Sequence, residues 1–212
     1  MKEKSKSGCW AGLIAIAYIF FALPVNAGSP TDQIRVTVEK VLMILNNPQL
    51  KSDSKKKERR DQLREVIYAR FDFNEMAKRS LGSHWQSRTP EEQREFVKVF
   101  TELLEESYVN KVEFYNGEKF LYVREMQNKN LSEVNTKLVT QKGEEFSINY
   151  KLHLANGEWK VYDVVLENIS LVNNFRSQFS RVLTNSSYEE LLRRMKEKQV
   201  EAPRRKEKDK PF

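Results

Sequence analysis

The sequence contains few residues of the kinds that build active sites. Cys9 is the only cysteine and lies within the first 27 residues, so the rest of the chain forms no disulfide and no cysteine–metal site. His84 and His153 are the only histidines, and neither has a metal-binding partner at the usual ligand spacing. The sequence also lacks a Gly-x-Ser-x-Gly motif and a glycine loop that would hold phosphate. These absences exclude the motif-based hydrolase, metalloenzyme and nucleotide-binding classes.

Little of the positive charge belongs to the middle of the chain. The formal charge is +7, of which residues 1–27 contribute +2 and residues 203–212 contribute +3, which leaves +2 for everything between them. A nucleic-acid-binding domain would need a basic face, so we expect no nucleic-acid partner. Residues 203–212 have two interpretations, a solvated disordered tail or a segment weakly attracted to anionic lipid headgroups. Blocks of charge are generally disordered, which favours the first.

The N-terminus has the pattern of an export signal. Three lysines at positions 2, 4 and 6 precede the uncharged stretch Trp10–Leu23, and small residues lead to Ala27. The alternative is a membrane anchor, but this stretch of 14 residues falls short of the ~20 that a spanning helix needs. We therefore predict a signal peptide over residues 1–27, cleaved after Ala27. The remaining 185 residues (212 minus 27) suit a single domain.

Helical signals dominate the first half of the chain. Ser29 or Thr31 can cap a first helix that Asn46-Asn47-Pro48 ends. A basic run at residues 55–60 leads into a second helix, and Asp72 with Glu75 forms a capping box for a third. Thr89-Pro90-Glu91-Glu92 starts a fourth helix, because proline is favoured at the first helical position.

The second half changes to the alternation of β-strands. Residues 146–154 alternate apolar and polar side chains, and Asn156-Gly157 is a strong two-residue hairpin signal. Weaker strand patterns lie at 120–123 and 134–139, and Ser170 and Ser187 are placed to cap two final helices. We therefore predict an α+β fold, with helices on one face of a curved antiparallel sheet of about four strands. The domain is expected to cover residues 28–186, followed by a C-terminal helix at 187–202 and the basic tail at 203–212.

Large apolar side chains gather on three of these elements. Ordinary core packing would explain them, since periodicity does not distinguish a filled core from a lined cavity. The alternative is an apolar pocket between helices and sheet. Its candidate lining residues are Phe96, Val99, Phe100, Leu103, Leu104, Tyr108, Ile148, Tyr150, Leu152, Trp159, Val161, Val164, Leu171, Phe175 and Phe179.

Two polar residues lie within these apolar segments. Asp163 is flanked by Tyr162 and Val164, and Arg176 lies on the helix that follows. A buried charge must be paired, so we expect Asp163 and Arg176 to face each other or to satisfy nearby backbone groups, in a structural role. A rival hypothesis is a small enzyme, similar to the isomerases or hydrolases of the cone-shaped NTF2-like class, that uses Asp163 or His84. The sequence shows no second polar group to partner either of them.

Several ordered motifs resemble those of the MlaC-type, or toluene-tolerance, phospholipid-binding proteins. The resemblance spans about residues 31–186, and its most specific block is residues 169–179. The other motifs are Phe71-Asp72-Phe73, Met76-Ala77, Leu81-Gly82 with Trp85, Thr89-Pro90-Glu91-Glu92-Gln93 with Phe96, Phe100, Leu103-Leu104 and Tyr108, and residues 157–164. One departure is Asn168, where the family often has glycine; asparagine also tolerates positive φ. The basic C-terminal extension is a second departure.

This resemblance implies a periplasmic carrier that is not an enzyme and needs no cofactor or metal. Such a carrier holds a phospholipid by its acyl tails between the helices and the sheet. The implied partners are an inner-membrane ABC transporter complex with an MCE-domain ring and an outer-membrane lipoprotein complex. The implied function is to shuttle phospholipid between the two and so maintain the lipid asymmetry of the outer membrane.

Overall fold

A computed structural model describes residues 28–112, with side chains through 108, and residues 115–200. The predicted signal peptide and the predicted basic tail at 203–212 lie outside this range. Helices α1 (Pro30–Asn46), α2 (Lys56–Arg70), α3 (Phe73–Leu81) and α4 (Pro90–Val112) precede the sheet. Helices α5 (Leu171–Asn185) and α6 (Tyr188–Lys196) follow it. Short 3₁₀ turns lie at Pro48–Leu50, Asp53–Lys55 and Gly82–Trp85.

The helix starts follow from local capping chemistry. Ser29 is the cap of α1, accepting from the Asp32 N–H at 3.1 Å. In the capping box of α4, Thr89 Oγ1 accepts from the Glu92 N–H while Glu92 accepts from the Thr89 N–H. Only half of the predicted box at α3 forms: Asp72 accepts from the Glu75 N–H at 2.9 Å, whereas the Glu75 carboxylate pairs with Arg79.

The sheet is an open antiparallel meander in the order β1-β2-β3-β4-β5. Its strands are β1 (Lys119–Asn128), β2 (Leu131–Val139), β3 (Glu145–Ala155), β4 (Glu158–Leu166) and β5 (Ile169–Ser170). The prediction of about four strands was close, because the fifth has only two residues and Ser170 also caps α5. Asn156 and Gly157 form the predicted hairpin turn, with φ of 51° and 80°. Asn168 also has positive φ, at 66°, a conformation that asparagine tolerates.

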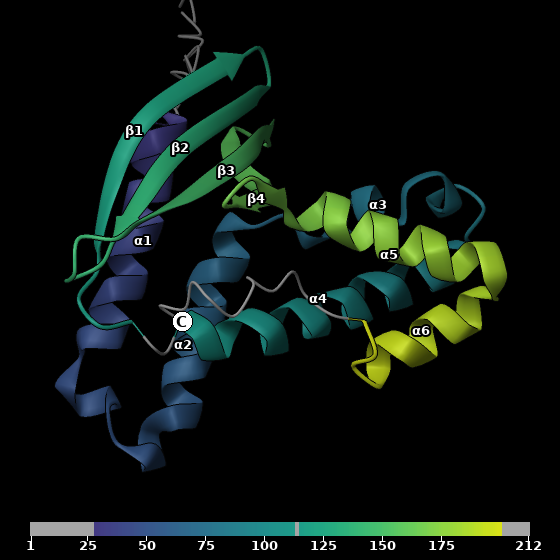
Figure 1. Ribbon diagram of the computed structural model, residues 1–212, viewed down its shortest axis with the longest axis horizontal. Helices are drawn as coiled ribbons and strands as arrows, with labels where there is room; N and C mark the ends of the chain where they lie inside the picture. The colour runs from purple at the N-terminus through teal and green to yellow at the C-terminus, as the bar shows by residue number, and fades with distance from the viewer. Residues whose placement is uncertain (1–27, 113–114, 201–212) are drawn as a thin grey trace, which may run out of the picture.

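Helix α1 lies across one face of a curved sheet, and α4, α5 and α6 extend to the side of it (Figure 1). Helix α1 packs against β1 and β2, whereas α2, α3 and α5 pack against β4. Helix α4 packs on α3 and α6 instead, and it lies below α5 in the view of Figure 1. The α+β prediction is therefore confirmed.

The buried apolar residues form two clusters. One lies among α3, α4, α5 and α6, and the other lies between α1, the sheet and the start of α5. Helix α6 belongs to the first cluster through Tyr188, Leu191, Leu192 and Met195, so it shares a core with the residues predicted as the domain at 28–186. Tyr108 of α4 packs against both clusters.

Candidate functional site

Seven of the fifteen predicted lining residues belong to a closed, largely aromatic core. Phe96, Phe100, Phe175 and Phe179 each have 0% exposed surface. The rings of Phe100 and Phe175 meet edge-on at 5.3 Å between centroids, and those of Phe96 and Phe179 at 5.6 Å, the geometry that aromatic pairs prefer. Val99, Leu103 and Leu104 are buried in the same cluster. These side chains pack on one another and leave no accessible surface on the four rings for a ligand.

The inner face of the sheet is different, because several of its apolar side chains keep accessible surface. Leu152, Trp159, Val161, Val164 and Leu171 are buried in the second cluster. Tyr122 of β1, Ile148 and Tyr150 of β3 and Leu166 of β4 pack against that cluster and are only half-buried. Val164 lies opposite Tyr150 and Val161 opposite Leu152, so a β-bulge between them keeps both valines on this face.

Helix α1 presents a matching apolar stripe beside this face. Ile34, Val38, Val41 and Leu45 lie at helical spacing on one side of α1. Ile34 is buried in the sheet cluster, whereas the other three are half-buried. Val38 packs against the sheet cluster, and Val41 and Leu45 continue the stripe towards the C-terminal end of α1. We call the half-buried set of Val38, Val41, Leu45, Tyr122, Ile148, Tyr150 and Leu166 the α1–sheet apolar surface. The stripe is visible in the sequence as apolar residues at helical spacing, but the predicted lining residues include none of them.

The tyrosines of this region are held neutral. Burial raises the pKa of the Tyr150 hydroxyl far above its ordinary value, and burial likewise raises that of Tyr108. Burial raises the pKa of Tyr122 to about 12, against the opposing effect of the Arg35 guanidinium above its ring. The Tyr150 side chain is thus strongly desolvated yet retains accessible surface.

Asp163 anchors α5 to the sheet and does not face Arg176. Its carboxylate accepts from Ser170 Oγ at 2.7 Å and from the Val172 N–H at 3.1 Å, and it lies 3.7 Å from Lys151 Nζ. Of the two expected arrangements, Asp163 therefore adopts the one in which it accepts from nearby backbone, and the charged group closest to it is Lys151 on β3. Arg176 is exposed and packs over Gly82, where an added Cβ would come within 2.8 Å of Arg176 Nε.

The two histidines lie apart from any group of catalytic residues in the part of the chain described. His153 Nε2 lies 3.0 Å from the Asp72 carboxylate, which already caps α3. His84 is half-buried in the turn before α4. Among residues 28–108 and 115–200, no three His, Cys, Asp or Glu side chains are grouped as a metal site would need. Within the same ranges no helix has the length and hydropathy of a membrane span.

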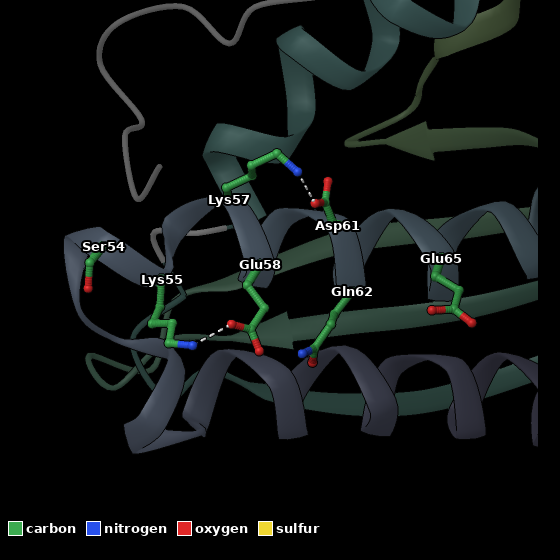
Figure 2. A pocket seen from close by; sticks show the side chains of 7 residues that line it. All are labelled: Ser54, Lys55, Lys57, Glu58, Asp61, Gln62 and Glu65. Atoms are coloured by element: carbon green, nitrogen blue, oxygen red, sulfur yellow. Dashed lines mark hydrogen bonds and ion pairs between the residues drawn. The ribbon is translucent and has the colours of Figure 1, made fainter.

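A separate hollow beside α2 is polar. Figure 2 shows it lined by seven side chains, with Lys55 paired to Glu58 and Lys57 paired to Asp61. Gln62 and Glu65 continue the lining along the same helix. Charged and amide groups suit water or ions, and burying them against acyl tails would be costly. This hollow is therefore no candidate for binding apolar ligands.

Comparisons with known proteins agree with this arrangement. The family model of the MlaC protein matches residues 35–197. The Toluene tolerance protein ttg2D of Pseudomonas putida is 25% identical over 171 residues, covering 80% of each chain. The Intermembrane phospholipid transport system binding protein MlaC of Haemophilus influenzae is 25% identical over 122 residues, which span 55% of this chain and 57% of that protein.

The fold itself also has a solved relative. A phospholipid-binding protein from Ralstonia solanacearum, solved in complex with a phospholipid, superposes with a TM-score of 0.71 at 22% identity. The superposition covers 82% of this chain and 99% of the other. Because the family model covers most of the described domain, the chain belongs to the MlaC family.

Proposed function

We propose that this protein is a soluble periplasmic phospholipid carrier with no catalytic activity of its own. It moves phospholipid between complexes in the inner and outer membranes and so maintains the lipid asymmetry of the outer membrane. The observation that carries the proposal is the α1–sheet apolar surface, a set of inward side chains that the fold leaves partly uncovered. Membership of the MlaC family and the lipid-bound structural neighbour support the same function.

The acyl tails are the part of the lipid that this surface suits. Val38, Val41, Leu45 and Ile148 offer hydrocarbon contacts, and the neutral Tyr122 and Tyr150 add aromatic area without charge. Burial of each methylene contributes about 0.8 kcal/mol relative to water. Two tails therefore gain tens of kcal/mol, which is ample to hold a lipid in an aqueous compartment.

The predicted lining residues then take two roles. Ile148, Tyr150 and Tyr108 contact the tails, with Leu152, Trp159, Val161, Val164 and Leu171 as the second layer beneath them. The aromatic core around Phe100 and Phe175 supports this site from the side and holds α4 against α5. We infer that core residues such as Phe96 and Phe179 meet a lipid only if the core opens.

The direction of lipid transport must come from partner proteins. A bilayer buries the same methylenes as the carrier does, so transfer from membrane to carrier is nearly balanced in free energy. The carrier removes the aqueous barrier and does not drive lipid uphill. Its proposed partners are the inner-membrane ABC transporter complex with its MCE-domain ring, which would supply ATP-driven direction, and the outer-membrane lipoprotein complex.

Lipid analysis of the purified protein tests the proposal. Mass spectrometry of the chain produced with its own N-terminus should find phospholipid in close to one-to-one proportion. Ile148→Trp should fill the α1–sheet surface and lower this occupancy several-fold. The matched control is Leu121→Trp on the outer face of β1, where the side chain is 46% exposed and lies opposite Lys137. Absence of phospholipid from the parent, or equal occupancy in both variants, would contradict the proposed site.

A further inference from the structure

The connection between α1 and α2 forms a basic end of the molecule. In Figure 1 the lower ends of these two helices project away from the sheet and from α5 and α6. Residues 51–57, here called the basic tip, hold four lysines and a single acid, Asp53, and every one of the seven is exposed. The residues on either side of the tip are joined by a hydrogen bond, which the Arg59 guanidinium donates to the Leu50 carbonyl at 2.6 Å.

The lysines of the tip are only partly neutralised. Lys55 pairs with Glu58 at 2.7 Å, and Lys57 pairs with Asp61 at 2.8 Å although its side chain is 90% exposed. Lys51 and Lys56 make no ion pair with any residue in the described part of the chain. Figure 2 shows the two acids, Glu58 and Asp61, further along α2 than Lys55. Exposed pairs of this kind are weak, so the tip keeps most of its positive charge for an outside partner.

Apolar side chains lie in the last turns of α1, which lead into the tip through the short turn Pro48–Leu50. Met43, in the last turn of α1, is 64% exposed. The half-buried Val41 and Leu45 lie in the last two turns of α1. The α1–sheet apolar surface therefore reaches the end of α1 that leads into the tip. An exposed apolar side chain beside several lysines is the combination that binds the interface of an anionic membrane.

We propose that the basic tip docks on the anionic headgroups of a bilayer and sets the end of the α1–sheet surface against that bilayer. This inference rests on the proposed function. A membrane fits better than a protein partner because lysine and serine, which compose most of the tip, are depleted from protein interfaces. Lysine is a point charge that imposes no shape on its partner, and a fluid headgroup layer has no fixed shape to match.

Vesicle binding by the full chain tests this inference. The test variant carries Lys51→Gln, Lys56→Gln and Lys57→Gln. The control variant carries Lys98→Gln, Lys129→Gln and Lys142→Gln, three exposed lysines elsewhere on the surface. The probe is vesicles of one part phosphatidylglycerol to three parts phosphatidylcholine, assayed by co-sedimentation at low and high salt.

At about 1 kcal/mol for each lysine near an anionic surface, we expect the test variant to bind at least about tenfold more weakly at low salt. The control should change by less than about twofold, and high salt should remove the difference because it screens the charges. Equal loss in the two variants would mean nonspecific attraction and would overturn the proposal. Undiminished vesicle binding by the test variant would also overturn the proposal. The partner of the tip would then be an acidic protein.

Lipid occupancy separates this inference from the proposed function. The test variant should retain the phospholipid content of the parent, because its three substitutions lie outside the α1–sheet surface, yet it should take up lipid from anionic vesicles more slowly. If the parent holds no phospholipid, the proposed function fails whatever the vesicle result. If the parent holds lipid and the test variant matches it in both vesicle affinity and uptake rate, only the docking inference fails.

Discussion

Replacing Asp163 by alanine should destabilise the protein by about 3–5 kcal/mol, because it removes two hydrogen bonds to a buried charge. The carboxylate is 3% exposed and accepts two hydrogen bonds, from Ser170 Oγ at 2.7 Å and from the Val172 N–H at 3.1 Å. Hydrogen bonds to a charged group contribute about 1.5–3 kcal/mol each. Lys151 adds little, because it lies 3.7 Å away and is one-third exposed.

The position of Asp163 adds a further reason for this cost. Val172 and Ser170 stand at the start of α5, where the free N–H groups and the helix dipole favour a negative charge. Asp163→Ala leaves the Val172 N–H without its acceptor and detaches α5 from β4. Asp163→Asn keeps one acceptor oxygen but loses the charge, so we expect about half the loss.

Urea unfolding followed by circular dichroism measures these changes as a shift of midpoint at constant slope. Arg176→Ala is the control: this arginine is exposed and should change the free energy of unfolding by no more than about 0.5 kcal/mol. A loss below about 1 kcal/mol for Asp163→Ala would refute the anchoring argument. A fully stable Asp163→Ala variant that had lost turnover of some substrate would instead favour the enzyme hypothesis.

Three further outcomes follow from the packing. Phe100→Ala, which empties part of the aromatic core, should cost about 3–5 kcal/mol in urea unfolding; a cost below about 1 kcal/mol would mean that the core collapses without strain. Gly82→Ala should cost about 1 kcal/mol or more in the same assay, because φ is +63°. In the Gly82→Ala variant, a second substitution, Arg176→Ala, removes the side chain that the new Cβ would meet and should recover only part of the lost free energy of unfolding. Full recovery would disprove backbone strain at Gly82. Burial raises the pKa of Tyr122 and of Tyr188 to about 12, above about 10 in the unfolded chain. The stability that these two neutral hydroxyls contribute is therefore complete below pH ~10 and lost as the pH rises through ~12. In a pH titration of the folded protein, tyrosinate absorbance from these two residues should appear only near pH 12. Ionisation of both near pH 10 in the folded protein would contradict this prediction.

Elements defined by short-range chemistry were predicted well from the sequence. Ser29, Thr89 and Ser187 each cap the helix that the sequence pattern placed after them. Asn156-Gly157 forms its hairpin. In each case the interacting atoms lie within a few residues of one another, so the chain around them needs no distant partner to adopt the structure.

Pairing across elements was predicted less well. The choice of Arg176 as partner for Asp163 considered only the nearest basic residue on the following helix. The structure places Lys151 directly opposite Asp163 in the β3–β4 ladder. A bulge between Lys151 and Leu152 sets that register, and no periodic pattern reveals where a bulge falls. The N-terminus of α5 then supplies the two donors, the Ser170 hydroxyl and the Val172 N–H, whose hydrogen bonds the Asp163 carboxylate accepts.

The sequence by itself determined that the chain is an α+β domain of the MlaC type, with large apolar side chains on a few elements. Only the tertiary structure divided those side chains. It buried the rings of Phe96, Phe100, Phe175 and Phe179 against one another and left Ile148 and Tyr150 partly uncovered beside α1. Periodicity reports which face of an element is apolar, whereas the surface that remains depends on how closely separate elements approach. That distance is set by packing over the whole fold.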